Sequence, residues 1–384
     1  MNFHFNEEEQ EILNMLEDFA AKEVGPRAQE VDEEERFPIE AREQLAEMGM
    51  MGIYFPEEYN GSGLSYMTYI GVCEKLAEYC ATTSIMVMAS ESLCAWPIFA
   101  YGTEEQKQKY LAPLCSGEKL GAFALTEPSA GTDAAMQKTV AVDKGDHWLL
   151  NGSKIFITNA HYADIFVIFA LTDKEAGTKG ISAFIIEKGT PGFDVTGHEK
   201  KMGIRGSSTS ELIFNDCKLP KENLLGELGK GFKIAMTTLD GGRVGVAAQA
   251  VGIAQGAIND ALAYVKERVQ FGKPIWKFQN TQFQLADMAT KVEAAKLLVY
   301  KAAKKKDEYK TNPKVSYSFE AAQAKLYAAE VAMEVTTKAV QLHGGYGYIK
   351  EYGVERMMRD AKITEIYEGT SEVQRMVISA QLLK

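Results

Sequence analysis

The chain lacks the features that mark a membrane-spanning, disulfide-rich or metal-binding protein. No stretch reaches the roughly 18 uninterrupted apolar residues that a spanning helix needs, and the opening MNFHFNEEEQ shows no basic and apolar leader. The five cysteines have no CxxC spacing, and the five histidines are scattered along the chain, which argues against a metal site. We therefore expect a soluble protein with reduced thiols, kept in a reducing compartment.

An excess of positive charge is also missing. The net charge of −11 argues against binding to nucleic acid or to an anionic membrane surface, although backbone amides could still hold an anionic ligand. The composition is otherwise globular, with 46% hydrophobic and 25% charged residues. A chain of 384 residues exceeds one ordinary core, which predicts two or three subdomains.

The pattern of apolar residues changes twice along the chain. Residues 1–120 show helical periodicity, with Asn6 and Glu9 placed to cap the first helix. Residues 121–230 are rich in strand formers, and HWLLNGSKIFIT around Asn151-Gly152 predicts a β-hairpin. Residues 231–384 are helical again, with the charge run 301–310 expected at a solvated helix end. This α, β, α order defines an α+β fold and excludes a doubly wound nucleotide fold, in which strands and helices alternate.

Three stretches could hold a ligand or could simply be turns and surface. ALTEPSAGTD (124–133) offers hydroxyls and free amides where helices give way to strands, but composition alone favours a tight turn between domains. QLHGGYGYIKEYGVERMMRD (341–360) has more glycine than a helix cap needs, and ERVQFGKPIWKFQ (267–279) carries Arg268 and Lys273 as anion partners or as a solvated patch. Neither GxGxxG nor GxxxxGK occurs in the first stretch.

The segment KITEIYEGTSEVQ (362–374) raises the same question for Glu368. It places this carboxylate between an aromatic residue and a Gly-Thr pair. Most acidic residues in such surroundings are surface charges, and the alternative is a base held where it can take a proton.

Taken together, these stretches resemble the acyl-CoA dehydrogenase family over essentially the whole chain. ALTEPSAGTD is similar to the first family signature, QLHGGYGYIKEYGVERMMRD to the second, and YEGTSEVQ to the segment that carries the catalytic base. The closest resemblance is to the short-chain, butyryl-CoA branch. It implies an N-terminal helical domain, a middle β-barrel-like domain and a C-terminal four-helix bundle, in a cytoplasmic bacterial-type enzyme or a mature mitochondrial-matrix form.

The resemblance also implies an FAD site between the middle and C-terminal domains. The residues that would line it from the middle domain are Phe123, Ala124, Leu125, Thr126, Gly131, Thr132, Phe156, Ile157 and Thr158. Those that would reach the flavin of a neighbouring subunit are Arg268, Phe271, Gln279, Gln341, Gly344 and Gly345, and Thr370 and Glu372 would close the adenosine side. Phe156 stands where the family often has Trp. A homotetramer, built as a dimer of dimers, is the family expectation, with electron-transferring flavoprotein as the redox partner.

For the acyl-CoA, the resemblance implies contacts from Thr132, Asp240, Arg243, Tyr367 and Gly369. Glu368 would take the α-proton, while its backbone N–H and a flavin ribityl hydroxyl would bind the thioester oxygen and flavin N5 would accept the β-hydride. Some branches place their base at the position of Gly242, and a glycine cannot serve as one. Burial should raise the pKa of Glu368 toward working pH.

Glu91 departs from the expected pattern, because its neighbours MASESLCAWPIF (88–99) resemble the helix at the far end of the acyl pocket. It could point at solvent or pair with a lysine. It could instead be a second carboxylate for a polar acyl group, or a second base for an alicyclic acyl-CoA. A short linear acyl-CoA is thus the first expectation and an alicyclic one the alternative. An acyl-CoA oxidase and a non-enzymatic helical binding protein are the rival classes.

Overall fold

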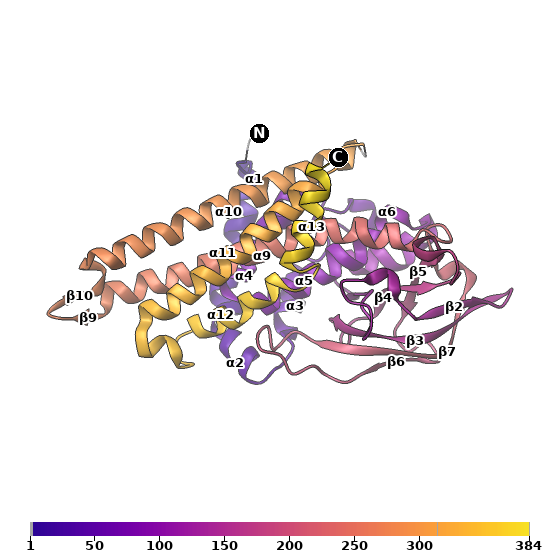
Figure 1. The fold of residues 1–384 in the computed structure, drawn as a ribbon, viewed down its shortest axis with the longest axis horizontal. Coiled ribbons are helices and arrows are strands. Elements are labelled where there is room, and N and C mark those ends of the chain that lie inside the picture. Colours follow the sequence, from indigo (N-terminus) through magenta and orange to yellow (C-terminus); the bar gives the residue numbers. More distant parts are fainter. Residues whose placement is uncertain (1–2, 313, 384) are drawn as a thin grey trace.

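The computed structural model describes residues 3–312 and 314–383, and Figure 1 shows a strand-rich part beside long helices. The N-terminal helices are α1 (Glu7–Phe19), α2 (Ala28–Glu33), α3 (Ile39–Glu47), α4 (Tyr66–Tyr79), α5 (Ala81–Met88), α6 (Trp96–Tyr101), α7 (Glu104–Gln106) and α8 (Ala112–Cys115). The predicted cap of the first helix is confirmed, because Asn6 and Glu9 form a reciprocal capping box.

The middle part is one mixed sheet of eight strands. These are β1 (Gly121–Ala124), β2 (Val140–Asp143), β3 (His147–Thr158), β4 (Ile165–Leu171), β5 (Ile181–Glu187), β6 (Phe193–Thr196), β7 (Thr209–Pro220) and β8 (Leu224–Leu225). Their order is β6-β7-β3-β2-β4-β5-β8, with β1 pairing in parallel with β4. Strands β4 and β5 are buried almost throughout, because helices pack on one face and the second apolar cluster of the sheet lies on the other.

The predicted hairpin at Asn151-Gly152 is wrong, because both residues lie inside the single long strand β3. The strand pairs with β7, and its register shifts between Leu150 and Gly152. Gly152 has φ +144°, and a Cβ there would overlap Thr139. The glycine therefore serves a β-bulge and a close approach of neighbouring backbone instead of a turn.

The C-terminal part is a helical bundle. It contains α9 (Gly231–Glu267), α10 (Gln279–Thr311), α11 (Ser318–His343), α12 (Val354–Ala361) and α13 (Ser371–Leu382), and the small strands β9 (Val269–Gln270) and β10 (Lys273–Pro274) join α9 to α10. Helix α9 packs against α4, α10 and α11 and extends to the sheet (Figure 1). One core consequently joins both helical parts and one face of the sheet.

One continuous helical run in the described residues, Ala81–Tyr101, is long and apolar enough to cross a membrane by length and composition. It comprises α5, the π-helical segment Ala89–Ala95 and α6. Because 89% of its most apolar window is buried inside the fold, this run is a core helix of the protein. All five cysteines are free and buried, as the prediction of reduced structural thiols requires.

Candidate active site

Glu368 occupies a strained turn just before α13. Its φ is +53°, and Gly369 follows with φ +93°. A non-glycine residue in this region is uncommon and needs support from its surroundings. The support comes from side chains that donate to the two carbonyls. Arg243 Nε reaches Glu368 O at 3.4 Å, and Lys325 Nζ and Gln374 Nε2 each reach Gly369 O at 2.7 Å.

The Glu368 carboxylate is buried without a hydrogen-bond partner, although the residue as a whole is half-buried. Both Oε1 and Oε2 are closed to solvent and unpaired. Desolvation raises the pKa of Glu368 to about 7, against the opposing charges of Lys325, Arg243 and Lys306. The surface-charge interpretation of this residue is therefore wrong, since both carboxylate oxygens are closed to solvent.

Helix α9 has a glycine where the Glu368 carboxylate packs against it. A Cβ at Gly242 would overlap Glu368 Oε2 and would lie 2.8 Å from Leu93 Cδ2. Glycines 241, 242 and 245 form one strip of α9, which we call the glycine strip, and the neighbouring side chains crowd against it. The missing side chains let Glu368 and its neighbours lie close to the helix backbone.

Tyr367 is fixed by a hydrogen-bonded chain that leads away from Glu368. Its hydroxyl donates to Gln249 Oε1, and Gln249 Nε2 donates to Ala81 O at 2.9 Å. Burial raises the pKa of Tyr367 well above its ordinary value, so the phenol stays neutral. It is therefore suited to packing and positioning and not to acid catalysis.

Asp240 and Arg243 form a partly buried ion pair beside the base. Arg243 Nη1 lies 2.6 Å from Asp240 Oδ1, which also accepts from Ser318 Oγ at 3.0 Å. Burial raises the pKa of Asp240, and the charge of Arg243 opposes the shift. Arg243 thus bonds both to Asp240, a predicted substrate contact, and to the backbone carbonyl of Glu368.

Glu91 neither points at solvent nor forms an ion pair in the described residues. It lies in the π-helical segment, 0% exposed, where Oε1 accepts from the Ile53 amide at 3.1 Å. The solvent-facing interpretation is thus wrong, because the Ala81–Tyr101 run is a core helix. Burial raises the pKa of Glu91 to about 8, while the charge of Lys306 opposes this shift. Lys306 is itself buried, so residues 301–310 are not wholly a solvated helix end.

The predicted flavin residues of the middle domain lie in two segments. Phe123 and Ala124 end β1, Leu125 and Thr126 follow, Gly131 and Thr132 are exposed, and Phe156 to Thr158 end β3. Phe156 has φ +61° and is 59% exposed while its neighbour Ile157 is buried. An exposed ring on strained strand backbone fits the stacking of a flat heterocycle. Gly131, with nothing within 4 Å of a Cβ position, leaves open backbone for a polar ligand edge.

A buried network holds these two segments together. Lys154 Nζ donates to Leu125 O at 3.0 Å, to Glu127 Oε1 at 2.8 Å and to Gln137 Oε1 at 3.1 Å. The Ile155 amide also donates to Thr126 O at 3.0 Å. The loop after β1 and the end of β3 therefore form one unit that can present a single surface.

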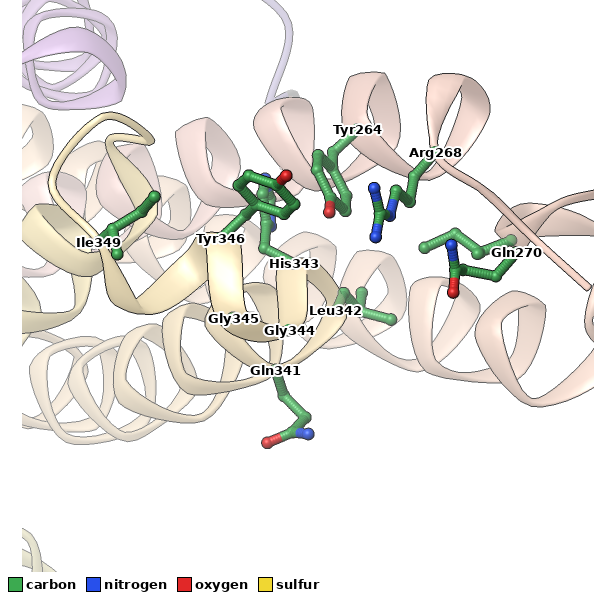
Figure 2. Close-up of a pocket in the computed structure, with 11 residues that line it drawn as sticks. Tyr264, Arg268, Gln270, Gln341, Leu342, His343, Gly344, Gly345, Tyr346 and Ile349 are labelled. Carbon is green, nitrogen blue, oxygen red and sulfur yellow. The ribbon is translucent and has the colours of Figure 1, made fainter.

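The second group of predicted flavin residues lies at the opposite end of the molecule (Figure 1). Arg268, Gln341, Gly344 and Gly345 line a cavity of about 520 Å³, and Figure 2 shows these residues at the end of α11 and beside α9. Gly344 ends α11 with φ +60° and ψ −134°, a conformation that favours glycine but is not the left-handed helical one. His343 is structural, because it stacks on Tyr264 at 4.2 Å and its Nδ1 lies 2.8 Å from Ala339 O.

Phe271 and Gln279 lie beside this cavity and do not line it. Phe271 is 93% exposed with φ +52°, in the turn between β9 and β10, and Gln279 begins α10. Thr370 caps α13 through a bond from the Val373 amide, and Glu372 is exposed in its first turn. The structure thus brings Glu368 together with Asp240, Arg243, Tyr367 and Gly369, but separates the two groups of flavin residues within one chain.

Several supporting residues escaped the sequence analysis. They are Lys306, Lys325, Gln249, Gln374 and Lys154, which are all buried. A signal existed for Lys325, whose neighbours in AAQAKLYAAE are small residues on a helix. A helix that is apolar or small on most sides packs against other elements, and its charged residue is then buried with it. No comparable signal marks Lys306, which sits among lysines in the charge run.

Comparison with known proteins agrees with this geometry. Family models of the acyl-CoA dehydrogenase N-terminal, middle and C-terminal domains match residues 6–118, 122–217 and 229–383. The chain belongs to the acyl-CoA dehydrogenase family. It is accordingly an FAD-dependent oxidoreductase, and the helical binding protein is ruled out.

Three relatives resemble the whole chain. The short-chain specific acyl-CoA dehydrogenase of Clostridium acetobutylicum is 58% identical over 384 residues, covering 100% of both chains. The structure of butyryl-CoA dehydrogenase from Megasphaera elsdenii matches with a TM-score of 0.97 at 54% identity, and covers 100% of both chains. A chain solved in work on the electron transferring flavoprotein of Acidaminococcus fermentans matches with a TM-score of 0.97 at 56% identity, again over 100% of both.

Proposed function

We propose that this protein is a short-chain acyl-CoA dehydrogenase in which Glu368 removes the α-proton of the thioester. The observation that carries the proposal is the buried, unpartnered carboxylate of Glu368 against Gly242. An α-hydrogen next to a thioester is weakly acidic, so its removal needs a desolvated base of suitable pKa. The likeness to the Clostridium and Megasphaera enzymes supports a butyryl-sized acyl group, with an alicyclic group as the alternative.

The residues of this chain divide the work between binding and proton transfer. Glu368 accepts the α-proton on its carboxylate, and its backbone N–H donates to the thioester oxygen as negative charge develops there. Arg243, Lys325 and Gln374 hold the turn that carries both groups. Asp240, Thr132 and Gly369 contact the acyl-CoA, and Tyr367 packs against it. When bound, FAD supplies the acceptor for the β-hydrogen and its electron pair.

The FAD site is shared between subunits in this proposal. Phe123 to Thr126, Gly131, Thr132 and Phe156 to Thr158 hold the flavin from one chain. Arg268, Phe271, Gln279, Gln341, Gly344 and Gly345 approach it from a second copy, with Thr370 and Glu372 at the adenosine side. The separation of these groups in one chain (Figure 1) favours this arrangement. The protein acts as a cytoplasmic homotetramer, and electron-transferring flavoprotein receives the electrons.

Anaerobic titration with butyryl-CoA tests the proposal. The flavin band of the purified holoenzyme should bleach rapidly, and the product should be the trans-2-enoyl-CoA. Glu368→Gln should bind FAD normally yet bleach about 10²–10⁴ times more slowly, the contribution typical of a general base. A Glu368→Gln enzyme that bleaches at the wild-type rate would remove Glu368 from the mechanism. Oxygen consumption during turnover would instead favour an acyl-CoA oxidase.

A further inference from the structure

A second set of buried polar groups lies next to the base. Glu91, Lys306, Tyr69 and Tyr317 are 0%, 5%, 0% and 3% exposed. Each has a side-chain atom without a hydrogen-bond partner, namely Glu91 Oε2, Lys306 Nζ and the two hydroxyls. Burying such groups unpaired is strongly unfavourable. We call these four residues the polar cluster.

Two other buried charges, Lys154 and Glu74, are well partnered, in contrast to the polar cluster. Lys154 donates to three oxygens. Glu74 accepts from Lys296 at 2.6 Å and from the Tyr300 hydroxyl at 3.0 Å. The fold can therefore satisfy a buried charge where only stability is needed, so the unpaired atoms of the polar cluster point to a ligand.

The glycine strip of α9 joins the polar cluster to the catalytic carboxylate. A Cβ at Gly241 would overlap Lys306 Nζ and would lie 3.7 Å from the Tyr317 hydroxyl. The adjacent Gly242 faces Glu368 in the same way, and a Cβ at Gly245 would lie 3.3 Å from the Tyr69 hydroxyl. The polar cluster and the catalytic carboxylate therefore border the same strip of α9.

The two charged members are held so that one face of each stays unbonded. Lys306 Nζ lies over aromatic rings, 3.9 Å from the centroid of Tyr66 and 5.3 Å from that of Trp96, which stabilises the cation without using its hydrogens. Glu91 uses Oε1 for the Ile53 amide and keeps Oε2 free. Each charge acts on the other, yet no ion pair within 4 Å joins them in the part of the chain that the structure describes.

The chemistry of the polar cluster selects one kind of substituent. A carboxylate on the acyl chain would face the carboxyl group of Glu91, and an ammonium group would face Lys306. A hydroxyl is both donor and acceptor, so it can bond Glu91 Oε2 and Lys306 Nζ together whichever of the two groups holds the proton. We propose that Glu91 and Lys306, aided by Tyr69 or Tyr317, recognise a hydroxyl group on the acyl chain beyond the β-carbon.

This inference rests on the proposed function and deepens it. The hydroxyl takes no part in the reaction, since only the α and β C–H bonds break and the double bond forms between those carbons. It contributes specificity, because a site built to bond a hydroxyl discriminates strongly against the analogue that lacks it.

Paired substrates test the inference on the holoenzyme. We would measure kcat/KM for butyryl- and 4-hydroxybutyryl-CoA, valeryl- and 5-hydroxyvaleryl-CoA, and 3-phenylpropionyl- and 3-(4-hydroxyphenyl)propionyl-CoA. In at least one pair the hydroxylated member should be used about 10-fold better or more. A wild-type enzyme that prefers the unsubstituted member of every pair would overturn the inference and leave the proposed function intact. Failure of all six to bleach the flavin would overturn the proposed function.

Variants of Glu91 and Lys306 test whether these residues cause the preference for a hydroxylated acyl group. Glu91→Gln keeps an acceptor for the Ile53 amide but can place a donor at Oε2, and Lys306→Met keeps the length of the stem without the charge. In both variants, kcat/KM for the hydroxylated member of the best pair should approach kcat/KM for the unsubstituted member. Lys305→Met is the matched control, because Lys305 is next in the chain and pairs with Glu308 at the surface. If Glu91→Gln and Lys306→Met fold, bind flavin and keep the wild-type ratio of kcat/KM between hydroxylated and unsubstituted substrate, the assignment is contradicted. If neither variant folds, the kcat/KM ratios of the wild-type enzyme alone decide.

Discussion

The carboxylate of Glu368 lies directly against the backbone of Gly242, so closely that a Cβ at this glycine would overlap Oε2. The two residues are far apart in sequence, and α9 and the turn before α13 bring them together. The position of the Glu368 carboxylate therefore depends on the absence of a side chain at residue 242. A base supplied from position 242 and a base at Glu368 would compete for the same space.

Gly242→Ala should damage catalysis more than stability. The added methyl group displaces the Glu368 carboxylate, and a misplacement of about 1 Å can lower the rate about 10²-fold. We expect kcat with butyryl-CoA to fall by about that factor while FAD stays bound. Gly353→Ala is a suitable control, because a Cβ there meets nothing closer than 3.4 Å. Stopped-flow bleaching of the flavin measures the rate of each variant. If Gly242→Ala and Gly353→Ala bleach at the same rate, the proposed effect of the contact is contradicted.

The pH dependence of kcat/KM should report the buried base. Only the ionised carboxylate accepts a proton, and burial raises the pKa of Glu368 to about 7. We expect kcat/KM for butyryl-CoA to rise with pH through about 7 and then to level, since kcat/KM follows the free enzyme. A profile already flat between pH 5 and 8 would show that the base ionises at its ordinary pKa.

The same shift predicts how stability changes with pH. The folded protein holds the Glu368 proton up to pH about 7, whereas the unfolded chain releases it near the ordinary glutamate pKa of 4.5. The unfolded state therefore binds fewer protons in this window, and stability falls as pH rises through it. Glu368→Gln removes that loss, so its Tm relative to the wild type should increase between pH 5 and pH 8. A constant difference in Tm would contradict the shift.

Lys325→Met should shift the pH profile and not only slow the reaction. Lys325 donates to Gly369 O at 2.7 Å, and its charge lowers the pKa of Glu368. Removing the charge raises that pKa, so the rise in kcat/KM should move to higher pH. Lys338→Met on the same helix is the control, because Lys338 pairs with Glu334 at the surface. A lower rate with an unmoved midpoint would assign Lys325 a structural role alone.

Lys154→Met should weaken FAD retention. It leaves Glu127 buried without its cation, and removal of one partner from a buried pair typically costs about 3–5 kcal/mol. The loop that holds Leu125 and Thr126 then loses its tie to β3. We expect a lower Tm and a lower flavin-to-protein ratio after gel filtration, and neither change in the exposed control Lys144→Met. Full flavin occupancy in a folded Lys154→Met protein would contradict this role of the network.

Much of the architecture could be predicted from local pattern. The order of helices, strands and helices, the cap at Asn6 and the end of α11 at Gly344 all depend on spacing within a few residues. The predicted hairpin at Asn151-Gly152 was wrong because it also depended on local pattern alone. Local chemistry favours a turn there, but β7 pairs along the whole of β3 and Thr139 packs against the glycine. Long-range pairing overrides a local signal.

The sequence by itself determined the family, the motifs and the identity of Glu368 as the candidate base, because these are properties of short stretches in a fixed order. Only the tertiary structure decided which charges are buried. The local pattern left Glu91 open between a surface and a pocket position and favoured the surface for Lys306, yet the packing of the π-helical segment, α4, α9 and α10 encloses both beside the base. Burial is a property of all the elements that surround a side chain. That is why a local pattern could identify Glu368 and could not predict the polar cluster next to it.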